Sequence, residues 1–433
     1  MSKIIENGDD LPHPPPLTPE QRKLISATVS ILAEHGVTIT KLFYKQMLEA
    51  HPELRNVFSH SKQQLGHQAE ALAHAVYAYA ANIEDLTPIL PVVERIAHKH
   101  TSVHIVPSQY AIVGKHLLEA ITQVVGADVF KGDLYAAWGA AYWNLAHIFI
   151  DRERQLYEAA QWTGWREFVL DRKVKETEEI TSFYLRPKDG KPLEPYRPGQ
   201  YISVQKYVPE LGFCQSRQYS LSDAPNPDYF RISVKREQGI RTVTSSGEVD
   251  TAHAAHPGWI SNLLHATLNE GDPIDVAFPF GEFFLDDSPA PVVLLSAGVG
   301  LTPLLAMLNT LVKAESGPSR DVSWVQAVRN ERVHAFRDHI RRIRSAHPER
   351  VKSTIFYSHP GADAVQGRDF DVAGRLDLEK VPRDVLRLDA RDAQYCVCGP
   401  EGFMQDMIEG LKARGVEGKR IHAEVFGAGA TPQ

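Results

Sequence analysis

The chain has 433 residues, and its 47 Lys and Arg against 54 Asp and Glu give a formal net charge of −7. A mildly acidic chain is a poor candidate for a nucleic-acid-binding protein, and 43% hydrophobic with 23% charged residues excludes a disordered or fibrous chain. At about 150 residues per domain, the length predicts roughly three domains. Three cysteines, no apolar run long enough to span a bilayer and an N-terminus without a signal-peptide core predict a cytoplasmic protein with no integral membrane segment.

The first part of the chain is predicted to be helical after a flexible, Pro-rich tail at residues 1–16. Thr18 is followed by Pro19 and Gln21, a combination that is typical of a helix start. Beyond it, apolar residues recur every three to four positions over long stretches. Few alternating β-branched runs interrupt this pattern, so residues 17–160 are predicted to form an all-α domain.

After the helical part, the period of the apolar residues changes to two. Short strands separated by turn residues are predicted at Phe168–Val174, Ile180–Leu185, Gln200–Gln205, Ser216–Leu221, Tyr229–Lys235 and Pro273–Phe278. Strands this short and closely spaced favour an antiparallel β-barrel over residues 161–287. The long polar stretch 238–257 is predicted to be an inserted loop.

In the last part of the chain, residues 288–433, strands alternate with helices. The predicted strands are Pro291–Ser296, Ser323–Val328, Ser353–Tyr357 and Gln394–Cys398, and the predicted helices are Thr302–Lys313, Val333–Ser345 and Phe403–Arg414. This alternation predicts a parallel sheet covered by helices. The fold class is therefore multidomain: an all-α domain, an antiparallel barrel and an α/β domain.

Glycine-containing turns follow two of the predicted parallel strands. The first turn consists of Gly298, Val299, Gly300, Leu301, Thr302 and Pro303, and the second of Cys398, Gly399 and Pro400. Glycines let the backbone approach a pyrophosphate, and a helix N-terminus offers free N–H groups with a partial positive charge. A plain tight turn is the alternative for either motif alone. Together they resemble the ferredoxin–NADP reductase superfamily, in which both segments line the nicotinamide nucleotide site.

The same superfamily holds FAD through an Arg-x-Tyr-Ser/Thr segment on a barrel strand. Here the matching residues in the predicted barrel are Arg217, Gln218, Tyr219 and Ser220. A guanidinium can pair with a pyrophosphate and a tyrosine ring can pack on a flavin. The resemblance also implies FAD contacts from Tyr201, Ser261, Val425, Phe426 and Gly427. A flavin beside a nicotinamide site exports single electrons, so we expect their recipient in the helical domain.

One histidine of the helical part lies in an unusual setting. His100 falls on the apolar stripe of its predicted helix, where a core histidine is the ordinary interpretation. In the last helix, Glu153 falls on the apolar face, and a carboxylate there requires a partner, for which Tyr110 and His100 are candidates.

Four further residues complete the pattern. Gln68 and Leu72 share one helix face, Phe58 ends a short link between two helices, and Tyr44 lies on the helix before it. With His100, they resemble the haem pocket of the flavohaemoglobin family, whose globin–flavin–nicotinamide order matches this chain over about residues 18–428. The segments that match closely are Leu42–Met47, His51–Phe58, Val93–Ser102 and Ala137–Glu153.

The flavohaemoglobin resemblance implies haem b, FAD and NAD(P)H as cofactors, with His100 as the axial ligand of the haem iron. It implies hydrogen bonds from Tyr110 and Glu153 toward the far nitrogen of that histidine. On the ligand side it implies Tyr44 and Gln68 as hydrogen-bond partners, Leu72 as a restriction on access and Phe58 as a packing residue. Lys99 and Glu424 are implied to lie near the haem–flavin junction.

The family resemblance implies a monomeric nitric oxide dioxygenase with O2 and NO as its substrates. NAD(P)H reduces FAD, FAD reduces haem, and the ferrous haem with O2 converts NO to nitrate. An oxygen-binding or oxygen-sensing globin with a built-in haem reductase is the alternative. A cytochrome-b5-type carrier is a weaker alternative, because only His256, Pro257 and Gly258 resemble a b5 haem turn and they lie in the predicted insertion.

Overall fold

The computed structural model describes residues 6, 8–58, 66–239, 258–313 and 320–426. All but the first two residues of the predicted loop at 238–257 therefore lie outside the described residues. The same is true of Gly427, for which a flavin contact is predicted. The domain divisions after residues 160 and 287 stay predictions.

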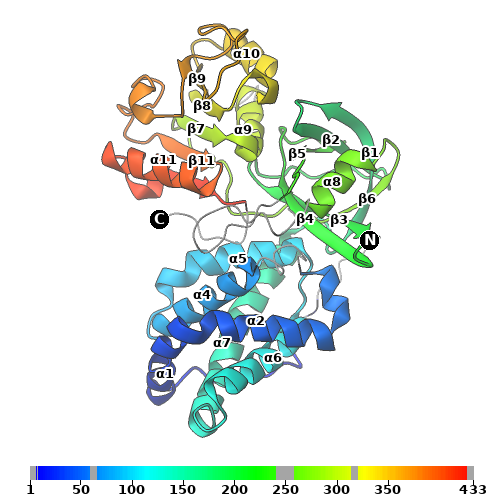
Figure 1. Ribbon diagram of the computed structural model, residues 1–433, viewed down its shortest axis with the longest axis vertical. Helices are drawn as coiled ribbons and strands as arrows, with labels where there is room; N and C mark the ends of the chain where they lie inside the picture. Colours follow the sequence, from blue (N-terminus) through cyan, green and yellow to red (C-terminus); the bar gives the residue numbers. More distant parts are fainter. Residues whose placement is uncertain (1–5, 7, 59–65, 240–257, 314–319, 427–433) are drawn as a thin grey trace.

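The helical part runs to Ala159 and forms the lower half of the molecule in Figure 1. Its elements are α1 (Pro19–Ser26), α2 (Val29–Ala50), η1 (Pro52–Asn56), α4 (His67–Ala81), η2 (Thr87–Ile89), α5 (Leu90–Ser102), α6 (Pro107–Val125) and α7 (Gly132–Ala159). The predicted helix start is confirmed: Thr18 Oγ1 accepts from Gln21 N–H at 3.2 Å, and Gln21 Oε1 accepts from Thr18 N–H at 2.9 Å. Apolar faces of α1, α2, α4, α6 and α7 meet in a buried core that includes Phe43, Met47 and Trp138.

The middle part is an antiparallel sheet in the order β4-β3-β6-β1-β2-β5. Its strands are β1 (Arg166–Lys175), β2 (Ile180–Pro187), β3 (Tyr201–Val208), β4 (Phe213–Ser220), β5 (Phe230–Lys235) and β6 (Pro273–Val276), with helix α8 (Trp259–Ala266). A bridge between Leu221 and Ile232 brings the two edge strands together, which closes the sheet into the predicted barrel.

Strand β4 begins three residues earlier than predicted, because its first residues bind the helical part. The backbone N–H of Cys214 donates to Asn56 Oδ1 at 2.8 Å. Polar residues such as Gln215 can extend a strand here because the helical part buries them and accepts their hydrogen bonds. A local sequence pattern does not record such a contact between distant segments.

The last part is a parallel sheet in the order β10-β9-β8-β7-β11-β12. Its main elements are β7 (Val292–Ala297), η3 (Gly298–Gly300), α9 (Leu301–Lys313), β8 (Val322–Val328), α10 (Arg337–Ala346), β9 (Val351–Tyr357), β10 (Val372–Ala373), β11 (Gln394–Cys398), α11 (Glu401–Ala413) and β12 (Ile421–Glu424). The predicted start of α10 at Val333 was wrong, because Phe336 has a left-handed backbone (φ 59°) that interrupts the helix.

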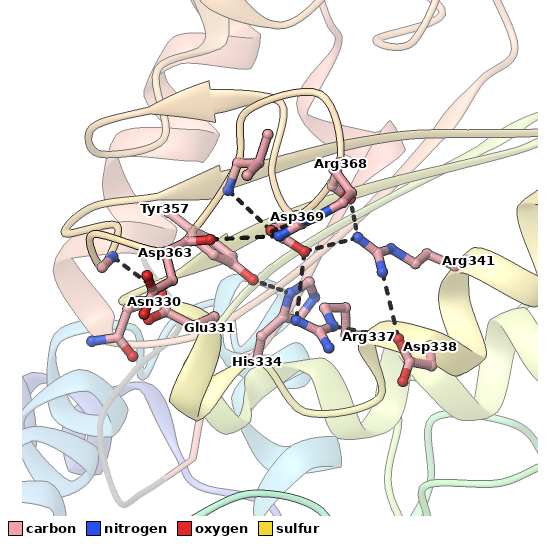
Figure 2. A network of polar contacts seen from close by, with 12 residues as sticks. Asn330, Glu331, His334, Arg337, Asp338, Arg341, Tyr357, Asp363, Arg368 and Asp369 are labelled. Carbon is pink, nitrogen blue, oxygen red and sulfur yellow. Dashed lines mark hydrogen bonds and ion pairs between the residues drawn. The ribbon is translucent and has the colours of Figure 1, made fainter.

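An ion-pair network lies beside α10 at the edge of the parallel sheet (Figure 2). Asp369 is 8% exposed and accepts from Arg368 at 2.7 Å, from Arg341 at 3.2 Å and from the backbone N–H of Val365 at 3.0 Å. The hydrogen bonds from Arg368 and Val365 hold the pKa of the Asp369 carboxyl well below its usual range. Asp369 is therefore the buried carboxylate that Arg337, Arg341 and Arg368 share, whereas Asp338, which also pairs with Arg337 and Arg341, is exposed.

We expect Asp369→Asn to destabilise the protein by about 2 kcal/mol at pH 7, because the guanidinium groups lose their shared carboxylate. Since the folded-state pKa is depressed, the contribution of Asp369 is present above about pH 4 and is lost as the pH falls further. Thermal unfolding of both proteins across this range measures the difference. Asp384→Asn, which removes the exposed partner of Lys352, is the control, and an equal effect of both variants would contradict the prediction.

Candidate functional site

The first part of the site lies where α5, α6 and α7 meet. His100 Nδ1 lies 2.7 Å from Glu153 Oε1 and 3.1 Å from the Tyr110 hydroxyl, which donates to the same Glu153 oxygen at 2.6 Å. Burial and the charge of Glu153 keep the pKa of Tyr110 well above its usual value, so the hydroxyl retains its proton. Because the Tyr110 hydroxyl donates its hydrogen bond to Glu153, the N–H on Nδ1 of His100 also donates to the carboxylate.

These contacts fit an axial haem ligand. Both engage Nδ1 of His100 and leave Nε2 as the nitrogen for a metal. Glu153 is 2% exposed, whereas 34% of the His100 side chain remains accessible. A histidine with one anchored nitrogen and an accessible outer edge suits iron ligation better than a role in the core. The sequence-based pairing of Glu153 with Tyr110 and His100 thus agrees with the geometry.

The predicted ligand-side residues come from α2, α4 and the segment after η1. Tyr44 is 8% exposed, and its ring packs edge-on against Phe58 with centroids 5.6 Å apart. Leu72 belongs to the same cluster of apolar side chains, and Gln68 lies half-buried one turn before it on α4. Burial raises the pKa of the Tyr44 hydroxyl, which therefore stays a neutral hydrogen-bond donor.

The predicted junction pair, Lys99 and Glu424, shares its surroundings with two more charges. Burial and the charge of Glu282 raise the pKa of Glu424 to about 8, while Lys99 and Arg95 act against the rise. Burial lowers the pKa of Lys99, and Glu424 opposes that shift. Arg95 could have been found from its place one turn before Lys99 on α5, whereas no local signal marks Glu282.

The predicted FAD segment occupies the second half of β4. Ser220 pairs with Tyr201 of β3, and Arg217 and Tyr219 are half-buried on one face of the strand. Burial lowers the pKa of the Arg217 guanidinium, so an anionic group such as a pyrophosphate would stabilise its charge. Gln218 Nε2 donates instead to Ser102 Oγ of α5 at 2.9 Å, which ties the segment to the helix of His100.

The remaining predicted FAD residues lie in two places. Ser261, in α8, is 8% exposed and its hydroxyl already donates to Gly258 O and accepts from Glu237 N–H. Val425 and Phe426 follow β12, and Phe426 is 45% exposed. An accessible aromatic side chain at this position fits packing against a flat ring.

The two predicted nicotinamide turns lie side by side at the carboxyl ends of β7 and β11, where Ser296 pairs with Cys398. A Cβ atom on Gly300 would come within 2.5 Å of the Cys398 carbonyl carbon and 2.6 Å of Gly399 N, so only glycine permits this approach. Gly298 is exposed with φ 56°, again a conformation that favours glycine.

Most side chains of these turns are buried. The fully or largely buried ones are Leu301, Thr302, Pro303 and Cys398, whereas Val299 is half-buried and Pro400 exposed. Burial raises the pKa of the Cys398 thiol well above its usual value. The turns therefore offer a nucleotide their backbone N–H groups at the start of α9 and α11.

Taken together, these parts define a globin joined to a flavin- and nicotinamide-dependent reductase. Figure 1 shows α5, which carries His100, on the side of the helical part that faces both sheets. Within the described residues, no helix is both long and apolar enough to cross a membrane.

Known proteins carry the same parts in the same order. A family model described as Globin matches residues 41–149, and one described as Oxidoreductase NAD-binding domain matches residues 294–409. The flavohemoprotein of Bordetella parapertussis is 48% identical over 420 residues, covering 95% of this chain and 99% of the relative. The flavohemoprotein of Rhizobium meliloti is 45% identical over 417 residues, covering 95% and 98%. This chain belongs to the flavohaemoprotein family.

Solved structures agree with this assignment. A flavohemoglobin from Malassezia yamatoensis, crystallised with bound FAD and heme, is 28% identical with a TM-score of 0.78, covering 95% of this chain and 100% of that one. The flavohem-like FAD/NAD binding domain of the nitric oxide dioxygenase from Vibrio cholerae is 35% identical with a TM-score of 0.50, covering 60% of this chain and 98% of that one.

Proposed function

We propose that this chain is an NAD(P)H-dependent nitric oxide dioxygenase with haem b, FAD and NAD(P)H as its cofactors. The observation that carries the proposal is the 2.7 Å contact of Glu153 with His100 Nδ1. A carboxylate on this nitrogen makes the imidazole a stronger electron donor to iron, which favours redox chemistry over simple oxygen carriage. The resemblance to the reductase part of a nitric oxide dioxygenase supports the same conclusion.

When bound, NAD(P)H, FAD and haem would supply hydride donation, single-electron transfer and O2 chemistry, respectively, for the conversion of NO to nitrate. The residues of the chain position these groups. The backbone at Gly298 and Gly399 receives the nicotinamide nucleotide, and Arg217 pairs with the FAD pyrophosphate. Tyr110 holds Glu153 against His100, and the Tyr44 hydroxyl would donate a hydrogen bond to a haem ligand.

We expect Tyr44→Phe to speed O2 release about tenfold and to lower NO consumption, because a buried donor to a partly negative ligand is lost. Stopped-flow measurement of the O2 dissociation rate checks this. Tyr79→Phe is the matched control, since Tyr79 lies in the same helical core but its hydroxyl donates to Ala141 O at 3.0 Å. An unchanged O2 dissociation rate in Tyr44→Phe would count against the assigned role.

An absorption spectrum of the purified protein, before and after NADH under CO, tests the electron path. We expect flavin and haem bands at first, and then flavin bleaching together with a CO-shifted Soret band. A b5-type carrier with two axial histidines would give no CO shift. Arrival of electrons at the haem without NO consumption would favour the oxygen-binding or oxygen-sensing alternative.

A further inference from the structure

One buried glutamine joins the FAD strand to the helical part. Gln215, on β4, is 1% exposed. Its Nε2 donates to Arg55 O at 3.1 Å and to Phe58 O at 3.3 Å, both in the corner formed by η1 and the two residues after it. The neighbouring Cys214 N–H donates to Asn56 Oδ1. Two consecutive residues of β4 are therefore hydrogen-bonded to this corner.

The glutamine lies in line with the predicted FAD residues. Because side chains alternate along a strand, Gln215, Arg217 and Tyr219 occupy one face of β4. At the other end of the contact, Phe58 packs edge-on against Tyr44. The chain of contacts therefore runs from the flavin strand through the Gln215 amide and the Phe58 backbone to the Tyr44 ring.

Other contacts attach the middle part to the helical part through α5. Gln218 donates to Ser102 Oγ, and the backbone N–H of Gly281 donates to His98 Nδ1 at 3.0 Å. Both anchors hold α5, the helix of the axial histidine. Gln215 instead holds the corner that leads to Tyr44, so its loss should affect the ligand side of the pocket while α5 stays attached to the barrel.

We propose that Gln215 is a positioning residue that fixes the Phe58 corner, and through it the Tyr44 hydroxyl, relative to the flavin strand. The inference rests on the proposed function only in treating Tyr44 as the donor to the haem ligand. Gln215→Met keeps the length and approximate volume of the side chain but removes the hydrogen bonds that Nε2 donates to Arg55 O, to Phe58 O and, within its own strand, to Cys214 O. A surface control is Gln366→Leu, which removes the hydrogen bond of an exposed glutamine to a backbone carbonyl, Asp371 O, far along the chain.

For the full-length holoprotein, we expect Gln215→Met to speed O2 dissociation about fivefold, less than Tyr44→Phe does, because the Tyr44 hydroxyl is displaced but not removed. Amide hydrogen exchange in residues 51–58 should become faster, while the rate of flavin reduction by NADH stays unchanged. Gln366→Leu should alter none of these quantities. A general loss of stability would also slow flavin reduction, whereas the proposed role changes only O2 dissociation and hydrogen exchange in residues 51–58.

A double-mutant cycle tests the route from Gln215 through Tyr44. If Gln215 acts by placing the Tyr44 hydroxyl, Gln215→Met should change O2 dissociation little in a Tyr44→Phe background. Fully additive effects, or an unchanged O2 dissociation rate in the single variant, would overturn the proposal. O2 dissociation and hydrogen exchange are measured without NO, so a failure here is distinct from a failure of the dioxygenase assignment.

Discussion

His100→Gly is expected to abolish NO consumption, with a fall of more than about 100-fold, while the flavin and nicotinamide parts keep working. Disturbing a group that hydrogen-bonds to a metal ligand costs about 10- to 100-fold in affinity or activity, so removal of the ligand itself should cost more. The reductase parts are built on two sheets, and the polar contacts of the His100 ring, to Tyr110 and Glu153, lie within the helical part. NADH oxidation with ferricyanide as acceptor should therefore stay near its wild-type rate.

Added imidazole distinguishes a lost ligand from a misfolded pocket. The glycine variant leaves room for a free imidazole beside Glu153 and Tyr110, the partners of the His100 ring. We expect imidazole to restore part of the haem content and of the NO consumption. A variant that retains haem and consumes NO at the wild-type rate would refute the assignment of His100.

Gly300→Val is expected to slow flavin reduction by NADH about 100-fold, because a displacement of about 1 Å at a reacting centre has effects of this size. The added Cβ would lie within 2.6 Å of Gly399 N and still nearer to the carbonyl group of Cys398, so the two turns must separate. Anaerobic stopped-flow absorbance of the flavin band measures the rate directly.

The control for this prediction is Gly402→Ala, in the first turn of α11, where an added Cβ meets no atom within 4 Å. We expect its flavin reduction rate to match the wild type. Dithionite should still reduce the haem of Gly300→Val, and CO should still bind it. Equal rates for Gly300→Val and the wild type would show that the close approach of the turns is not needed for hydride transfer.

Much of this architecture could be predicted because it depends on local patterns. The change of apolar period from helical to alternating reflects which faces are buried, and the structure follows it. The Thr18 cap and the two glycine turns have short-range causes. Glu153 was found because a carboxylate on an apolar face requires a partner, and the structure supplies Tyr110 and His100.

The features that sequence reasoning missed are mostly contacts between distant segments. Gln215 donates to Phe58 O although the two residues are 157 positions apart, and the sequence around either residue does not predict this contact. The charge of Glu282 raises the pKa of Glu424, and this effect too could not be predicted because the two residues are far apart in the sequence. Strand β12 was not predicted, because its four residues gain strand structure by pairing with β11.

The most direct test of the central claim is the aerobic consumption of NO by the purified holoprotein with NADH, followed with an NO electrode and by nitrate analysis. We predict rapid, NADH-dependent loss of NO with an equimolar yield of nitrate, which disappears in His100→Gly. Persistence of NO while NADH reduces both flavin and haem would contradict the dioxygenase assignment and favour an oxygen-binding or oxygen-sensing protein.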